Sequence, residues 1–218
     1  GAPEPAQSKG WGGVLLSLDF LVLVVIFGGV SANVTAAFAY LGNVADAFGV
    51  DPAVFAAVAF NCNTWSRLAC GVLADVMFRR LGPMGITIGI ASAHCLMFAG
   101  FSLLLAASWG IGGGGIVQGA TALLFAAFGG GTPFVSSHVK SAFDARRMGV
   151  VMGLVFTSTA AVNMVVAQAA GPRPSGAAGA YVPGDFSLPF GTGAGIACCV
   201  APVTLMWVAE RLRHPRVE

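Results

Sequence analysis

Charged side chains are scarce in this sequence. Asp, Glu, Lys and Arg together make up 9% of its 218 residues, whereas soluble domains contain about 25%. A chain with so few charges could not cover a soluble surface. Apolar residues make up 56%, and the mean hydropathy is +0.82. The composition therefore predicts an integral membrane protein.

Several kinds of functional motif are also missing. The net charge is only +2 and no basic patch alternates with aromatic residues, so nucleic acid is not an expected partner. The five cysteines form no CxxC pair, so buried thiols are expected rather than metal ligands or disulfides. The glycine run at 112–115 lacks the Lys of a phosphate-binding loop, and no catalytic triad motif is present. The sequence therefore predicts neither an enzyme nor a bound metal or cofactor.

Six apolar runs are long enough to cross a bilayer, for which a helix needs about 20 residues. They cover about 14–40, 52–74, 84–107, 111–135, 148–170 and 190–209. The runs are continuous, whereas membrane-spanning β-strands alternate, so helices are expected. The predicted fold class is all-α: an integral membrane bundle of six transmembrane helices over 14–210, with an N-terminal segment at 1–13 and a basic tail at 211–218.

The basic residues predict the orientation of this bundle. With the N-terminus inside, nine of the eleven basic residues fall in inner segments, and only Arg173 falls in an outer one. This satisfies the positive-inside rule. Both termini are therefore expected on the inner side, whether cytoplasmic, stromal or matrix. The first outer loop ends in Asp51-Pro52, which is typical of a helix N-cap followed by a first-turn proline.

The end of the second predicted span carries most of the charge in that region. Arg67, Gly71 and Asp75 are spaced four residues apart, so they share one stripe of a helix. Arg79 and Arg80 follow, and the stretch is interpreted as a short charged loop between two spans. Gly71 is expected to admit a neighbouring helix, and Asp75 to accept from an Arg or a helix start. Ordinary topology-setting charges are the alternative.

This stretch resembles a known motif. Gly71-Val72-Leu73-Ala74-Asp75-Val76-Met77-Phe78-Arg79-Arg80 resembles the G-x-L-A-D-R-x-G-R-R loop of the major facilitator superfamily, with Val76 and Phe78 replacing Arg and Gly. The segments at 63–75 and 143–149 are similar to segments of its nodulin-like, monocarboxylate-type branch. The resemblance implies the C-terminal six-helix half of a twelve-helix transporter.

The resemblance also implies a mechanism, in which two halves rock about a central site. It assigns Asp75 to a gate between the halves, supported by Arg79 and Arg80. Arg146 and Arg147 begin the fifth span, where the partner half's motif is expected to dock.

Polar residues within the predicted spans are candidates for lining a central cavity, because polar groups in a membrane are costly. They are Asn33, Asn61, Asn63, His94, Gln118 and Asn163. Helix–helix hydrogen bonding is an alternative role for most of them. His94 is interpreted as a proton or anion site, as a packing residue, or as a pigment ligand if the chain belongs to a photosynthetic complex. His138 is expected to be a solvated residue near an inner loop.

Two functions therefore stay open. The first is small-solute transport, organic anions included, by alternating access when the chain pairs with a second six-helix half or a second copy. The second is a non-transporting structural subunit derived from a transporter, in a larger photosynthetic or respiratory membrane assembly. A pigment-binding antenna is disfavoured because no Glu lies within the spans. The chain begins at Gly1 without a signal-peptide layout, so either a leader was removed or the chain is a fragment.

Overall fold

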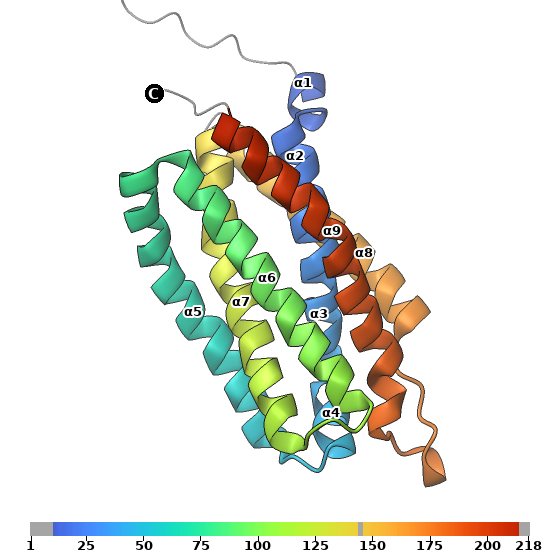
Figure 1. Ribbon diagram of the computed structural model, residues 1–218. Helices are drawn as coiled ribbons and strands as arrows, with labels where there is room; N and C mark the ends of the chain where they lie inside the picture. Colours follow the sequence, from blue (N-terminus) through green and yellow to red (C-terminus); the bar gives the residue numbers. More distant parts are fainter. Residues whose placement is uncertain (1–10, 144–145, 214–218) are drawn as a thin grey trace, which may run out of the picture.

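The computed structural model describes residues 11–143 and 146–213, apart from the side chains at positions 29, 30, 32, 36 and 211. Every regular element in these two ranges is helical, and the long helices run side by side as an elongated bundle (Figure 1). The predicted all-α class is confirmed.

The first predicted span is helical but not uniform. α1 (Trp11–Leu15) is followed by α2 (Leu18–Leu23), a π-helical segment η1 (Val24–Val30) and α3 (Ser31–Ala39). Ser17 caps α2, because its hydroxyl accepts from the Phe20 amide at 3.3 Å. Within η1, a methyl group at Gly28 would lie 2.8 Å from the Ser158 hydroxyl. Glycine therefore allows the π segment to approach the helix that carries Ser158.

Short α4 (Leu41–Ala47) leads to two long neighbouring helices, α5 (Pro52–Leu81) and α6 (Pro83–Ser108). The predicted cap of α5 is confirmed: Asp51 Oδ1 accepts from the amides of Ala53 at 2.8 Å and Val54 at 3.1 Å. Only Gly82 separates the two helices, and its φ of 58° favours glycine. The charged loop predicted here is therefore wrong, because its acidic and basic residues lie on α5 itself.

The second half of the chain contains α7 (Gly114–Ala142), α8 (Met148–Ala170), the 3₁₀ turns η2 (Ala177–Gly179) and η3 (Pro183–Phe186), and α9 (Ser187–Arg213). α7 continues seven residues beyond the predicted end at 135. Pro133 lies within it without ending it. The loop before α9 is held by Asp185, whose carboxylate accepts from Ser175 and from the Val182 amide.

Five segments are long and apolar enough to cross a membrane, which indicates a multi-pass membrane protein. They are Leu18–Ala39, Pro83–Ser108, Gly114–Ala142, Met148–Ala170 and Pro183–Glu210. Within the described ranges α5 does not meet this criterion, although it is the longest helix, because polar and charged residues interrupt its apolar run. The second predicted span, at 52–74 on α5, therefore stays a prediction, and with it the total of six spans.

α7 lies at the centre of the packing. α5 and α6 both pack along it, α9 packs on α6, and α8 packs on η1 and α3. Glycines allow the closest approaches. A methyl group at Gly89 would overlap the Phe134 ring, and one at Gly129 would overlap the backbone oxygen of Asn63 and the Ser66 hydroxyl. α8 has only one packed face, so its opposite, largely apolar face is available to lipid.

Candidate functional site

One face of α5 combines polar, charged and aromatic side chains. Phe60, Thr64, Arg67, Gly71 and Asp75 follow the spacing i, i+4, i+7, i+11 and i+15, which places them on one side of the helix. We call these five residues the α5 stripe. All are exposed except Gly71, which is half-buried. Arg67 lies halfway along α5, beside the contact of Ser66 with Gly129 near the middle of α7.

The charges on this helix have no partner within the described part of the chain. Arg67, Asp75, Arg79 and Arg80 form neither an ion pair nor a side-chain hydrogen bond there. The expected contact of Asp75 with Arg79 and Arg80 is therefore absent from the described residues. Gly71 was expected to admit a neighbouring helix, but a methyl group at this position would meet nothing within 4 Å. If these residues have contacts, they lie outside this part of the chain.

A series of aromatic contacts joins the α5 stripe to α8. Phe38 on α3 contacts Phe60 with ring centroids 5.6 Å apart, Phe125 at 4.0 Å and Phe128 at 6.2 Å. Phe27 on η1 contacts Phe128 at 6.4 Å and Phe156 on α8 at 5.6 Å. We call these six rings the phenylalanine seam. Its two ends are open, since Phe60 is 53% exposed and Phe156 is 44% exposed. The seam therefore crosses the bundle from the exposed Phe60 on α5 to the exposed Phe156 on α8, with Phe27 and Phe125 buried between them.

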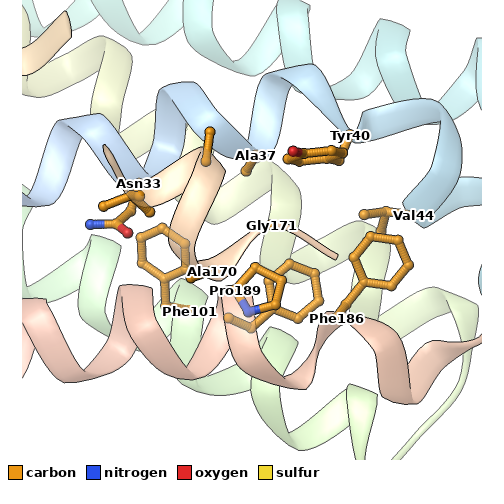
Figure 2. A pocket seen from close by; sticks show the side chains of 12 residues that line it. Asn33, Ala37, Tyr40, Val44, Phe101, Ala170, Gly171, Phe186 and Pro189 are labelled. Atoms are coloured by element: carbon orange, nitrogen blue, oxygen red, sulfur yellow. The ribbon is translucent and has the colours of Figure 1, made fainter. Parts of the chain in front are cut away.

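Asn33 is buried beside this seam and lines a small cavity between α3, α6, α8 and α9. Figure 2 shows Asn33 at one end of the cavity, Val44 and Phe186 at the other, and the Tyr40 ring along the wall. The cavity volume is about 20 Å³, which is room for one water molecule. It is too small for a solute that a transporter would carry.

The two asparagines of α5 have different surroundings. Asn61 is exposed, and its Nδ2 donates to the Ala57 carbonyl of the same helix at 2.8 Å. Asn63 is buried where α5 meets Gly129 of α7. Asn61 is therefore placed for contacts outside the chain, and Asn63 for packing within it.

His94 joins two helices of the bundle. It is only 2% exposed, and its Nε2 lies 2.9 Å from the Ala197 carbonyl oxygen of α9. Its Nδ1 has no hydrogen-bond partner in the described ranges. This geometry fits the packing role more directly than a proton, anion or pigment site.

The other two polar candidates lie elsewhere. Gln118 is half-buried near the N-terminal end of α7, and Asn163 is half-buried on α8, where its Oδ1 lacks a partner in the described ranges. Of the six candidates, only Asn33 lines the small cavity. The structure therefore does not bring these six residues to one cavity.

Arg146 and Arg147 directly precede α8. Arg146 is exposed, and the Arg147 guanidinium lies 5.3 Å from the ring centroid of Trp11. A cation at this distance over a Trp face is a stabilising contact. It connects the N-terminal helix α1 to the beginning of α8.

A buried cluster at the same end of the bundle was not predicted from the sequence. His138 was expected to be solvated, but its side chain is 0% exposed. Its Nε2 lies 3.6 Å from Asp19 Oδ1, and the Trp207 indole donates to the same oxygen at 3.2 Å. His138 and Trp207 also meet edge to face, with ring centroids 4.9 Å apart. Asp19 and Trp207 are 188 residues apart, so no local motif signals this cluster.

The outer surface between α5 and α6 has an apolar groove of about 280 Å³, with α7 as its floor. Small residues form much of it, including Gly89, Ala93 and Gly130. Its polar groups are limited to Ser66, Cys70 and Ser92. In a bilayer, such a groove suits lipid chains rather than a polar solute.

Comparisons of the chain with protein-family models, with curated proteins and with solved structures found no match. The resemblance to the major facilitator superfamily therefore stays a prediction.

Proposed function

We propose that this chain forms one six-helix half of a membrane transporter for small organic anions. In this proposal the α5 stripe, which includes the exposed Phe60, lines a path shared with a second half. The observation that carries the proposal is Arg67, a permanently charged residue that is exposed halfway along α5 and has no partner in the described ranges.

The depth of Arg67 makes a lipid environment costly. Asp75 lies eight residues further along α5, which is about 12 Å at 1.5 Å per residue. If Asp75 sits at the membrane boundary, Arg67 lies about 12 Å inside it. An Arg at the centre of a spanning helix costs about 2.5–3.5 kcal/mol on insertion scales. Arg67 therefore needs water or an anion, and its planar guanidinium is suited to binding a carboxylate.

A partner half with a different sequence explains the α5 stripe better than a second copy of this chain does. Two copies with the same orientation are related by an axis along the membrane normal, so identical residues lie at identical depths. If their stripes met, Arg67 would face Arg67 and Asp75 would face Asp75, and both pairs would repel. A distinct half can instead place a carboxylate or a wet cavity opposite Arg67.

The structural-subunit alternative is favoured by a separate observation. The cavity beside Asn33 holds about one water molecule, so it does not provide a route for a solute. In this alternative, another subunit covers the α5 stripe without a cavity and supplies a carboxylate to Arg67. Both alternatives require a partner. They differ in whether water or a packed subunit lies against the α5 stripe.

Cysteine labelling in native membrane vesicles separates the two. In a background with all five cysteines replaced, Thr64→Cys reports on the stripe, and Trp65→Cys, on another side of α5, is the matched control. We expect a membrane-impermeant sulfonated thiol reagent to label position 64 at least tenfold faster than position 65, and lactate to slow this labelling. Equal, slow labelling of both positions would refute the proposed path.

Uptake of radiolabelled lactate by the same vesicles tests the transport step. We expect Arg67→Ala to abolish protein-dependent uptake and Arg213→Ala, at the exposed end of α9, to retain it. Uptake that is equal in both variants would remove Arg67 from the proposed role.

A further inference from the structure

Three helices that are distant in sequence meet at the inner end of the bundle through Asp19, His138 and Trp207. Asp19 lies near the start of α2, His138 near the end of α7, and Trp207 near the end of α9. Asp19 Oδ1 accepts from Trp207 Nε1 at 3.2 Å and lies 3.6 Å from His138 Nε2. Two nitrogen atoms therefore converge on a single carboxylate oxygen.

The contact between Asp19 and His138 has the length of an ion pair. Hydrogen bonds from nitrogen to oxygen are normally 2.7–3.2 Å long, so 3.6 Å exceeds that range. An imidazolium and a carboxylate still attract strongly at this separation, because the surroundings are poor in water. A neutral imidazole would gain much less from the same geometry.

The positions of both residues on their helices favour their charged forms. Asp19 is in the first turn of the continuous helical segment Leu18–Ala39, where an anion is stabilised by the helix dipole. His138 is one turn from the C-terminal end of α7 at Ala142, where a cation is stabilised. The edge-to-face contact with Trp207 adds an aromatic neighbour that tolerates a cation.

Of the two ionisable residues in this cluster, Asp19 is the one that reaches the surface. The Asp19 side chain is 15% exposed, whereas His138 is fully enclosed. A proton can therefore arrive from the inner aqueous side at the carboxylate and pass to the imidazole beside it. A buried ionisable residue in a membrane helix is often functional, because it is expensive to keep there.

We propose that Asp19, His138 and Trp207 form a proton-binding site at the inner end of the bundle. The His138 imidazole takes one proton from the inner solution and becomes an imidazolium facing the Asp19 carboxylate. The Trp207 indole holds that carboxylate in place. Binding of the proton creates an ion pair between α2 and α7, and its release leaves a neutral imidazole there. The proposal does not depend on the transport function.

Other charged groups near this end are placed differently. On α7, Lys140 is exposed; on α9, Glu210 and Arg213 are exposed, and the Arg211 side chain lies outside the described residues. At the start of α8, Arg147 contacts Trp11 and Arg146 is exposed. Asp19 carries a carboxylate that lies 3.6 Å from His138 Nε2.

Nitrogen NMR of the full chain in lipid bilayers tests this site directly. With ¹⁵N-labelled histidine, only His94, His138 and His214 contribute imidazole signals, and His138→Gln identifies those of His138. We expect these signals to change from neutral imidazole to imidazolium between about pH 8 and pH 5. Asp19→Asn is expected to lower the midpoint of this transition by at least about one pH unit, a tenfold weaker affinity for the proton.

Asp46→Asn is the matched control, because Asp46 is an exposed carboxylate at the opposite end of the bundle and should leave the midpoint unchanged. If either variant at the site does not fold, the wild-type chain suffices. The ¹³C-labelled Asp19 carboxyl carbon then identifies the His138 signals through the short distance between them. His138 signals that do not change between pH 8 and pH 5 would overturn the proposal, as would an unchanged midpoint in Asp19→Asn.

Discussion

Removing one ring from the phenylalanine seam tests how the bundle is held together. Phe38 is the best choice, because its ring contacts Phe60, Phe125 and Phe128, on α5 and α7. Each aromatic pair contributes about 0.5–1.5 kcal/mol beyond area burial. In a membrane the usual gain from leaving water is small, because lipid tails are as apolar as the protein interior. Phe38→Ala should therefore lower the free energy of unfolding by about 2–4 kcal/mol.

Equilibrium unfolding with SDS in mixed micelles, followed by circular dichroism, measures this change. Phe98→Ala is the matched control: Phe98 is 40% exposed on α6 and has no ring partner in the described ranges. It should change the free energy of unfolding by less than about 0.5 kcal/mol. A Phe38→Leu variant keeps an apolar side chain and should fall between the two. If Phe38→Ala and Phe98→Ala lose equal stability, the seam does not hold α3 to α5 and α7.

Three further predictions concern other contacts. Gly129→Leu should lower the free energy of unfolding by about 1–3 kcal/mol in the same assay, because the new side chain meets α5, whereas Gly119→Leu enters open space and should be neutral. His94→Phe removes one hydrogen bond between α6 and α9 and should cost only about 0.6 kcal/mol, the average measured for such bonds in membranes. Asp185→Ala should speed hydrogen exchange at the Ser175 amide, which now donates to the Asp185 carboxylate, as measured by mass spectrometry. An unchanged exchange rate would show that this contact does not order the loop before α9.

The helices predicted from long apolar runs match the structure well where their ends are marked by special residues. The predicted span 84–107 corresponds to Pro83–Ser108, and the predicted span 148–170 corresponds to Met148–Ala170. A chain in lipid must satisfy its backbone polar groups internally, so a continuous apolar run of this length becomes a helix. Proline at the first turn of α6 then marks where that helix begins.

Hydropathy does not predict where a helix ends when the helix continues beyond its apolar run. α7 continues to Ala142 through polar residues that include Ser136, Ser137 and Lys140. α5 likewise continues to Leu81 through three charged residues, Asp75, Arg79 and Arg80. Hydropathy reports which residues prefer lipid, whereas helix formation depends on backbone hydrogen bonds that polar residues also form. The loop predicted between the spans 52–74 and 84–107 was wrong for this reason.

Contacts between distant segments could not be predicted from the sequence at all. The π segment η1 coincides with the close approach of Gly28 to Ser158, and the buried cluster needs three helix ends to converge. A histidine near a predicted loop has the same local sequence whether it is solvated or buried. His138 is enclosed because α2 and α9 bring Asp19 and Trp207 to it.

α5 does not qualify as a membrane span by its apolarity, and Arg67, which lies halfway along it, is also the residue on which the proposed function rests. α5 has 30 residues and is about 45 Å long, whereas the hydrocarbon layer is about 30 Å thick, so one end or both must extend beyond it. If the hydrocarbon layer ends at Asp75, with Arg79 and Arg80 in water, Arg67 lies about 12 Å inside the boundary. Sliding α5 outward to free Arg67 would bring other apolar residues into water. A helix of this kind is stable across a membrane only when something polar lies against its charged side. Arg67 makes α5 unfavourable as a helix surrounded only by lipid. For the same reason, we expect a water-filled path or a charged partner beside Arg67.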